Sequence, residues 1–404
     1  MLKLKIGAAS NIKIGRRRVK RFKFNVMVDG AWGSCGKGLI TTALAHRYLP
    51  QAITTTNMPN AGHTARWHDG TPFIAKVLPS AAILHRWIDD YKPLIYVGPS
   101  AAFNLEQLFL EVDRCGLDEH LIIHERASVV TDEMKNAESG NGAGSTKHIA
   151  STMQGCGVAL AAKIQRVEGL KLASDYEDLM PFMSQAFVKR MTRHTPIQAE
   201  PFSISVFWNE MLRNESMTLL HEGSQGFSLD INHGSHYPFC TSRSTTAAQA
   251  LTDIGIAPQL LGDVYLVIRP YPIRVGNVYE NGVRVGYSGG AYEGQSEITW
   301  EEIARRCGGP PSVFAGELTT VTKRLRRVFE FSCHQLFEAT RINGATKIAL
   351  NFANYLDWSC FGETEFRRLP SRVLRFIDQI EDVVELPVSI IGTGPNNNNV
   401  VFRD

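Results

Sequence analysis

Short apolar segments recur along the chain and are separated by longer stretches with helical spacing. Two of the longer stretches, AAFNLEQLFLEVDRCGL and RRVFEFSCHQLFEATRIN, predict helices. Six short runs, each bounded by turn residues, predict buried strands: FNVMVDG, LIYVG, HLIIH, MTLLHEG, KIALNFAN and PVSIIGTG. Strands that alternate with helices favour an α/β fold, in which helices flank a large, mostly parallel β-sheet.

No proline-, glycine- or serine-rich linker divides the chain, and low complexity is confined to four asparagines at 396–399. We therefore predict a basic N-terminal extension over residues 1–23 and one elaborated domain over residues 24–404. The extension lacks the apolar core of a secretory signal, which leaves a targeting peptide, a basic arm or a plain extension as alternatives.

Composition limits the class of protein. The chain has 404 residues, of which 44% are hydrophobic and 21% charged, and its net charge is +3. Lysine and arginine are concentrated in the extension, so the remainder is mildly acidic and nothing indicates nucleic-acid binding. No segment has the roughly 18 consecutive apolar residues that would span a bilayer. Seven scattered cysteines without a CxxC pair favour a reducing cytoplasm over a disulfide framework or zinc cluster.

The segment VDGAWGSCGKGL (residues 28–39) follows the first predicted strand and precedes a predicted helix. Gly33, Gly36 and Gly38 let backbone amides approach a polyphosphate at the positive end of that helix, and Lys37 adds a mobile charge. Gly38 stands where a serine or threonine would bind magnesium in the usual phosphate loop. The alternative interpretation is a simple tight turn.

Three further segments carry candidate chemistry. PNAGHT (59–64) places His63 in a glycine loop, although a lone histidine is more often structural. The 28 residues from 221 to 248 are rich in histidine, glycine and hydroxyl groups, and long loops in compact domains are usually functional. The basic run 323–327 can bind carboxylates, although such a run is more often a solvated helix face.

Together and in this order, the four segments resemble the adenylosuccinate synthetase family. That family reads WGDEGKG, NNAGHT and EGAQG…LDIDHGTYP…TSSNTTAG where this chain has WGSCGKG, PNAGHT and EGSQG…TSRSTTAA. Further matches are KVLPS (76–80), RVG (274–276) and TGP (393–395). The resemblance runs from about residue 24 to the end. It implies a single catalytic domain with a phosphate-loop-like nucleotide site, and a magnesium-dependent carbon–nitrogen ligase.

Two departures change the implied substrate. Ser34 and Cys35 stand where the family has Asp and Glu, a pattern similar to the 2-aminoadenylosuccinate synthetases of phages. That branch implies dGMP in place of IMP, joined to L-aspartate through a 6-phosphoryl purine in 2,6-diaminopurine deoxynucleotide biosynthesis, in the host cytoplasm. A carboxylate would crowd the amino group of guanine, whereas a serine hydroxyl can accept a hydrogen bond from it.

The resemblance also implies roles for individual residues. The catalytic groups would be Ser34, Lys37, His63 and Gln225, with the Gly62 carbonyl as a magnesium ligand. A homodimer is implied because Arg166 would reach the neighbouring subunit's nucleotide. The ATP site would comprise Gly33, Gly36, Lys37, Gly38, Gly62, His63, Thr64, Asn351, Asn354, Thr393, Gly394 and Pro395. The dGMP site would comprise Ser34, Asn60, Ala61, Thr152, Arg166, Gln225, Thr241, Val275 and Gly276, and the aspartate site Thr319, Thr320, Lys323 and Arg324.

The phosphoryl donor is predicted from the segment Asn351-Phe352-Ala353-Asn354. The family has TKLD here and reads GTP, because an acidic side chain accepts from the N1 and amino groups of guanine. Asparagine offers one donor and one acceptor, which matches adenine. We therefore expect ATP or dATP as the donor.

Three questions stay open from the sequence. The chain could be an ordinary adenylosuccinate synthetase that acts on IMP, or a nucleotide-binding paralogue that has lost activity together with its carboxylates. The base that takes the purine N1 proton is not identified, since Asp29 is the nearest carboxylate in the sequence but nothing shows that it reaches the purine.

Overall fold

A computed structural model describes residues 24–117, 119–140, 145–192 and 203–403, so the predicted extension 1–23 lies outside the described residues. Its centre is a nine-stranded sheet in which only the last strand, β18, runs antiparallel to its neighbour. In spatial order the strands are β18 (Val400–Phe402), β17 (Val388–Gly392), β16 (Lys347–Leu350), β10 (Leu261–Ile268), β1 (Phe24–Asp29), β9 (Leu219–Glu222), β2 (Ala52–Thr55), β5 (Leu94–Val97) and β7 (Leu121–Ile123).

The central strand β1 is buried on both faces, which explains its continuous apolar sequence. Phe24, Val26 and Val28 pack into one core, and Met27 packs into the other. Because side chains alternate along a strand, a single short run supplies both cores.

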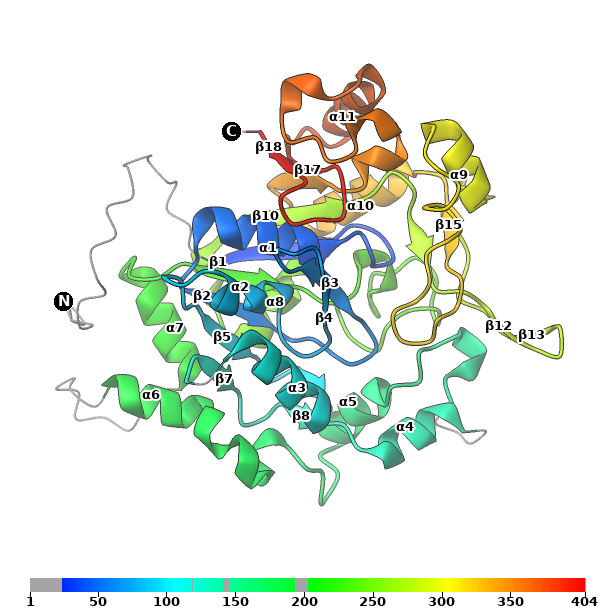
Figure 1. Ribbon diagram of the computed structural model, residues 1–404. Coiled ribbons are helices and arrows are strands. Elements are labelled where there is room, and N and C mark those ends of the chain that lie inside the picture. Colours follow the sequence, from blue (N-terminus) through cyan, green and yellow to red (C-terminus); the bar gives the residue numbers. More distant parts are fainter. Residues whose placement is uncertain (1–23, 118, 141–144, 193–202, 404) are drawn as a thin grey trace.

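Helices cover both faces of the sheet (Figure 1). The first core is closed by α7 (Ile204–Arg213), α8 (Ala247–Ile254), α10 (Cys333–Asn343) and α11 (Ser371–Val384). The second core is closed by α1 (Lys37–Tyr48), α2 (Leu84–Trp87) and α3 (Leu105–Cys115). The other helices are α4 (Asp132–Ser139), α5 (Cys156–Gln165), α6 (Ser184–Thr192) and α9 (Trp300–Cys307).

Smaller sheets surround this centre. A three-stranded sheet has the order β11 (Ile273–Arg274), β15 (Arg327–Phe329) and β14 (Glu297–Ile298). The strands β12 (Val278–Glu280) and β13 (Val283–Gly286) form a hairpin that projects from the body (Figure 1). Two more pairs are β3 (His63–Arg66) with β4 (Pro72–Ala75), and β6 (Ala102–Phe103) with β8 (Ser128–Val129).

The predicted fold class is confirmed, and all six predicted strands occur in the sheet. The predicted helix over 326–343 is wrong in its first part, because residues 327–329 form β15 and the helix begins only at Cys333. Valine and phenylalanine favour the strand there, and the Ser332 side chain caps the helix by accepting from Gln335 N–H. The prediction also missed β2, β10 and β18 of this sheet. In the described part of the chain, no helix is long and apolar enough to cross a membrane.

The parallel strands bring polar residues to one edge of the sheet. Asp29 ends β1 and Glu222 ends β9, while Arg269, Asn351 and Thr393 directly follow β10, β16 and β17. Ligands of open parallel sheets bind outside this carboxyl edge, where loops from separate strands meet. The candidate site therefore begins here.

Candidate active site

One buried carboxylate, that of Asp29, binds backbone amides of the phosphate loop (residues 30–38). Asp29 accepts backbone N–H bonds from Ala31 (3.0 Å), Gly33 (3.1 Å) and Cys35 (2.9 Å). Gly33 and Gly36 have φ angles of +84° and +79°, a conformation that glycine adopts without steric cost. Asp29 is 1% exposed, so it shapes the loop from behind and does not face a ligand.

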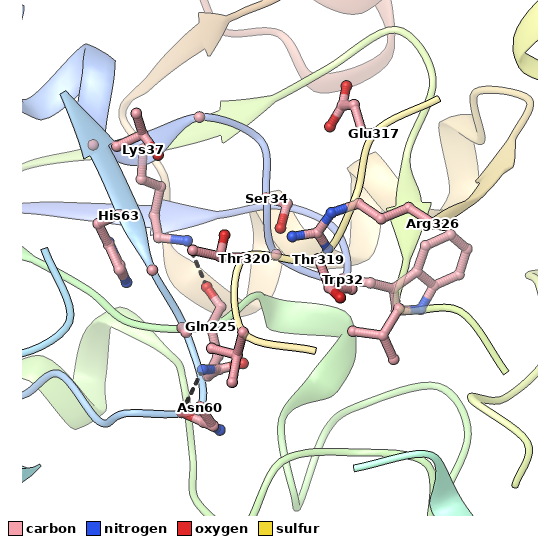
Figure 2. A pocket seen from close by; sticks show the side chains of 18 of the residues that line it. Trp32, Ser34, Lys37, Asn60, His63, Gln225, Glu317, Thr319, Thr320 and Arg326 are labelled. Carbon is pink, nitrogen blue, oxygen red and sulfur yellow. Dashed lines mark hydrogen bonds between the residues drawn. The ribbon is translucent and has the colours of Figure 1, made fainter. Parts of the chain in front are cut away.

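Lys37 is the first residue of α1, and its ammonium group lies between the loop and a neighbouring strand end. Its Nζ donates to the Gln225 carbonyl at 2.7 Å and lies 3.3 Å from Asp29 Oδ2. The Gln225 side chain donates in turn to Asn60 Oδ1 at 3.0 Å. Figure 2 shows these two hydrogen bonds across one wall of a cavity. Lys37 thus places positive charge where the helix N-terminus also favours an anion.

His63 is oriented by a carboxylate that the sequence analysis did not single out. Its Nδ1 lies 2.5 Å from Glu222 Oε1, and the other carboxylate oxygen accepts from Ser80 Oγ (2.5 Å) and Ser80 N–H (3.0 Å). Burial alone would raise the pKa of Glu222, but His63 and Ser80 together hold it below its usual value of 4.5. Glu222 therefore stays ionised, and Nε2 of His63 is left for the cavity. The sequence did carry a signal, because Glu222 ends the predicted strand MTLLHEG and begins the EGSQG motif.

These groups line the first cavity, whose volume is about 360 Å³. Its walls come from the phosphate loop, the PNAGHT segment, the strand end at Gln225 and the loop before β15. Of the described residues that line it, only Glu317 carries a carboxylate. The site residues predicted from the sequence that line this cavity are Gly33, Ser34, Gly36, Lys37, Gly38, Asn60, Ala61, Gly62, His63, Thr64, Thr152, Gln225, Val275, Thr319 and Thr320.

Ser34 is exposed to this cavity and adopts φ +58°, a left-handed conformation that is uncommon for serine. Its carbonyl accepts from Arg269 Nη1 at 3.1 Å. Arg269 is itself paired with Glu317, at 2.6 Å between Nη2 and Oε1. The one carboxylate among the described lining residues is therefore already paired with a cation.

In the basic loop before β15, Arg324 binds backbone carbonyls whereas Arg326 lines the cavity. Arg324 donates to the carbonyls of Gly276 (3.1 Å), Ala150 (3.0 Å) and Ser151 (2.8 Å), so it fastens the loop and does not line the cavity. Lys323 is exposed and also lies outside the lining. Arg326 lines the cavity and points toward Ser34 in Figure 2.

The Arg326 guanidinium makes no hydrogen bond to the described part of the chain, and its burial lowers its pKa. It is thus a partly dehydrated cation aimed into the cavity, which suits an anionic ligand. The basic run 323–327 was the sequence signal, but the sequence could not show which of its members faces inward.

A second cavity, of about 310 Å³, adjoins the first and shares Asn60, Thr152, Gln225, Leu229 and Val275 with it. Its described lining includes no lysine or arginine, but the Oγ1 atoms of Thr146 and Thr241 lie buried there without a partner. Of the other residues predicted for dGMP, Gly276 holds Arg324 through its carbonyl, and Arg166 is exposed at the end of α5.

A third cavity, of about 220 Å³, lies on the other side of the phosphate loop and is lined largely by aromatic rings, with Gly394 and Pro395 at one side. Asn351 lines it, but its Nδ2 donates to the Cys35 (3.1 Å) and Gly36 (3.4 Å) carbonyls. Asn354 is 5% exposed and has no hydrogen-bond partner among the described residues. Thr393 lies outside the lining, because its hydroxyl donates to the Glu363 carbonyl at 2.7 Å.

Comparison with known proteins identifies the family. The profile described as adenylosuccinate synthetase matches residues 26–201 and 176–359. The chain belongs to the adenylosuccinate synthetase family. Members of this family are carbon–nitrogen ligases, so the predicted enzyme class is confirmed.

Both branches of the adenylosuccinate synthetase family occur among the relatives. The N6-succino-2-amino-2'-deoxyadenylate synthase of Vibrio phage phiVC8 is 31% identical over 385 residues, covering 94% of this chain and 98% of that protein. The adenylosuccinate synthetase of Archaeoglobus fulgidus is 30% identical over 378 residues, covering 93% and 97%. Overall identity therefore does not choose between the branches.

A solved structure from the phage branch has the same fold. The succinoaminodeoxyadenylate synthetase of cyanophage S-2L, bound to dGMP and dATP as an energy donor, matches with a TM-score of 0.73 and 29% identity. The match covers 94% of this chain and 95% of that chain. The predicted resemblance to the 2-aminoadenylosuccinate synthetase branch is thus supported by sequence relatives and by structure.

The donor groups of this adenylosuccinate synthetase family member limit how it could hold magnesium. No group of three or more histidine, cysteine or acidic side chains suited to a metal occurs in the described residues. The Asp29 carboxylate is occupied by loop amides, whereas Gly62 lines the first cavity. Because Mg²⁺ binds through few protein ligands plus water and substrate phosphates, a single backbone carbonyl such as Gly62 fits it.

Proposed function

We propose that this enzyme joins dGMP to L-aspartate with hydrolysis of ATP or dATP. The products are N6-succino-2-amino-2'-deoxyadenylate, phosphate and ADP or dADP. One observation carries the proposal: Ser34 faces the first cavity at the position where the ordinary family has an aspartate.

The purine would lie with its N1 and amino edge toward Ser34. The serine hydroxyl accepts a hydrogen bond from the amino group that distinguishes guanine from hypoxanthine. A site that pairs a polar substrate group rejects analogues without it more sharply than an apolar pocket does. The Arg269–Glu317 ion pair keeps the one lining carboxylate away from that role.

The proposed reaction has two steps. The purine O6 attacks the γ-phosphorus of the donor while the N1 proton passes to water or a phosphate oxygen, and the bond to the bridging β–γ oxygen breaks. Lys37 neutralises phosphate charge during this transfer, which depends mainly on positioning and electrostatics. The aspartate amine then attacks C6, the C6–O bond breaks, and inorganic phosphate leaves.

His63 acts at the oxygen that gains charge. With Nδ1–H directed at ionised Glu222, its Nε2 can hold or deliver a proton at the purine O6 or the adjoining phosphate. Gln225 positions Lys37 and Asn60 in the wall of the first cavity, because its backbone carbonyl accepts from Lys37 and its side-chain amide donates to Asn60.

We assign the aspartate carboxylates to Arg326, Thr319 and Thr320. These residues line the first cavity together, whereas Lys323 and Arg324 lie outside it. A guanidinium binds carboxylates with two parallel hydrogen bonds, and the carboxylate nearby in the described lining, Glu317, is already bound in a bidentate pair by Arg269. Arg324 instead anchors its loop by donating to three backbone carbonyls, those of Gly276, Ala150 and Ser151.

The dGMP phosphate would occupy the second cavity, where Thr152, Thr146 and Thr241 offer hydroxyl groups. The described lining supplies no cation for this dianion. Exposed Arg166 of a second copy supplies it in our proposal, which makes the active enzyme a homodimer. Both subunits would then complete each other's site.

The donor base would occupy the third cavity between aromatic rings, with Asn354 reading its edge. Asparagine can accept from the adenine amino group and donate to the ring nitrogen beside it. Asn351 is committed to the phosphate loop, so Asn354 is the proposed reader.

The bound Mg²⁺, held by Gly62 and phosphate oxygens, would offset phosphate charge. We place this diaminopurine-deoxynucleotide enzyme in the cytoplasm of a phage-infected cell, where its nucleotide substrates occur.

The test is a pair of parallel incubations with L-aspartate, ATP and magnesium, one with dGMP and the other with IMP. Mass spectrometry of the nucleotide product and release of phosphate are measured together. Succinylated product from dGMP, with little from IMP, supports the proposal. Product from IMP alone identifies an ordinary adenylosuccinate synthetase, and no phosphate from either identifies an inactive paralogue.

A further inference from the structure

We propose that Arg269 and Glu317 are a positioning pair that holds Ser34 against the acceptor purine and thereby sets the preference for guanine. The inference rests on the proposed function and adds two residues that act through the Ser34 backbone. It follows from what surrounds the Ser34 backbone.

The pair is bidentate and joins buried Arg269 to half-buried Glu317, which lines the first cavity. Arg269 Nη2 lies 2.6 Å from Glu317 Oε1, and Nη1 lies 3.2 Å from Oε2. The same Nη1 donates to the Ser34 carbonyl at 3.1 Å. Arg269 is 1% exposed, so its guanidinium has no water with which to exchange these bonds. The Arg269 guanidinium thus links the phosphate loop, at Ser34, to Glu317 in the segment before β15.

Ser34 needs such a restraint. Its φ of +58° is disfavoured for a side chain with a Cβ atom, and the neighbouring glycines of the loop do not restrict it. The hydroxyl can recognise one amino group only from a fixed place, since it has no second polar atom to compensate for a shift. Fixing the carbonyl of the same residue fixes the direction in which the side chain leaves the backbone.

The other side of the pair faces the donor. The Phe352 ring lies 4.0 Å from the Arg269 guanidinium carbon, and Tyr355 Oη donates to Glu317 Oε1 at 3.2 Å. Phe352 and Tyr355 also line the third cavity. Phe352 and Tyr355, which would contact the donor base, therefore also contact the Arg269–Glu317 pair that positions Ser34. Burial alone would raise the pKa of Glu317, but Arg269, Arg326 and the Tyr355 hydroxyl together hold it below its usual value, which keeps the pair ionised.

The decisive variant is Glu317→Gln, which keeps the shape of the side chain and removes its charge. We measure kcat and KM for dGMP and for IMP, KM for L-aspartate, and Tm. The ratio of kcat/KM for dGMP to that for IMP should fall about tenfold to a hundredfold, because displacement of a positioned group by about 1 Å can cost about 10²-fold. KM for L-aspartate should change much less than KM for dGMP.

Asp253→Asn is the matched control. It breaks the buried Arg243–Asp253 ion pair, which does not line the first cavity. In that pair, Arg243 also donates to the carbonyls of Thr56 and Ser100. It should lower Tm comparably and leave the dGMP-to-IMP ratio unchanged. A merely structural role of Glu317 predicts the same behaviour in both variants.

An active Glu317→Gln enzyme with the wild-type ratio overturns the inference. If that variant does not fold, Tyr355→Phe weakens the same pair by one hydrogen bond, and an unchanged ratio there has the same meaning. If the wild-type enzyme makes no product from dGMP, the proposed function fails instead, and the two failures are therefore distinguishable.

Discussion

The pairing of His63 with Glu222 makes the Glu222→Gln substitution a sharp test of the proposed chemistry. The substitution keeps the volume and the contact to Ser80 but removes the charge opposite His63 Nδ1, 2.5 Å away. A hydrogen bond to a charged group is worth about 1.5–3 kcal/mol, and about 1.36 kcal/mol changes a rate tenfold. We therefore expect kcat to fall about 10- to 150-fold if the full interaction acts in the transition state.

The assay is steady-state phosphate release with dGMP, L-aspartate and ATP, with KM determined for each substrate. KM for dGMP should change little, because Glu222 lies behind His63 and is fully buried. His63→Gln in the same assay should cost at least as much. Unchanged kcat in Glu222→Gln would refute the orienting role, and a large rise in KM for dGMP with constant kcat would show that the pair binds substrate instead.

The same variant should alter the pH dependence of stability. The folded-state pKa of Glu222 lies below its ordinary value of 4.5, so its ionised form stabilises the fold at pH values above 4.5. That contribution declines as the pH falls through the lower folded-state pKa. The wild-type protein should lose stability in this acidic window more steeply than Glu222→Gln, and parallel curves from urea unfolding would contradict the assignment.

Three further predictions concern separate parts of the site. Lys37→Met should lower kcat by at least about 10²-fold, because it removes the charge that would neutralise the transferred phosphoryl group, and it should lower Tm because buried Asp29 loses its cation; near-normal turnover would contradict its role. Arg326→Lys should raise KM for L-aspartate about tenfold or more, since an ammonium cannot replace a bidentate fork, whereas an unchanged KM would return the role to another residue. Asn354→Asp should shift donor preference from ATP toward GTP in parallel rate measurements, and an unaltered preference would remove Asn354 as the base reader.

Local pattern was enough to predict most of the sheet. Short apolar runs ending in glycine, asparagine or aspartate locate strands well, because parallel strands are buried on both faces. The run before Cys333 was misassigned, since its spacing suits a helix while its valine and phenylalanine residues pair with β11 and β14. Such a pairing depends on residues more than 25 positions away, which a local window does not include.

Contiguous motifs allowed the sequence to indicate which segments form the candidate site. The sequence did not show which side chains of a segment point into the cavity. Residues of the phosphate loop, PNAGHT and EGSQG line the same cavity. The basic loop shows the limit: Arg324 and Arg326 are two residues apart, yet one fastens backbone carbonyls and the other faces the cavity. The orienting role of Glu222 depends on distance in the fold, so it emerges only from the structure.

The most direct test of guanine selection by Ser34 is competition between dGMP and IMP for wild-type enzyme and for Ser34→Asp. Aspartate tolerates the left-handed conformation of residue 34, so the variant should fold. With equal concentrations in one reaction, we expect the wild-type enzyme to make succinylated product almost entirely from dGMP. For Ser34→Asp we expect a shift toward IMP of at least about tenfold. The same product ratio from both enzymes would contradict it.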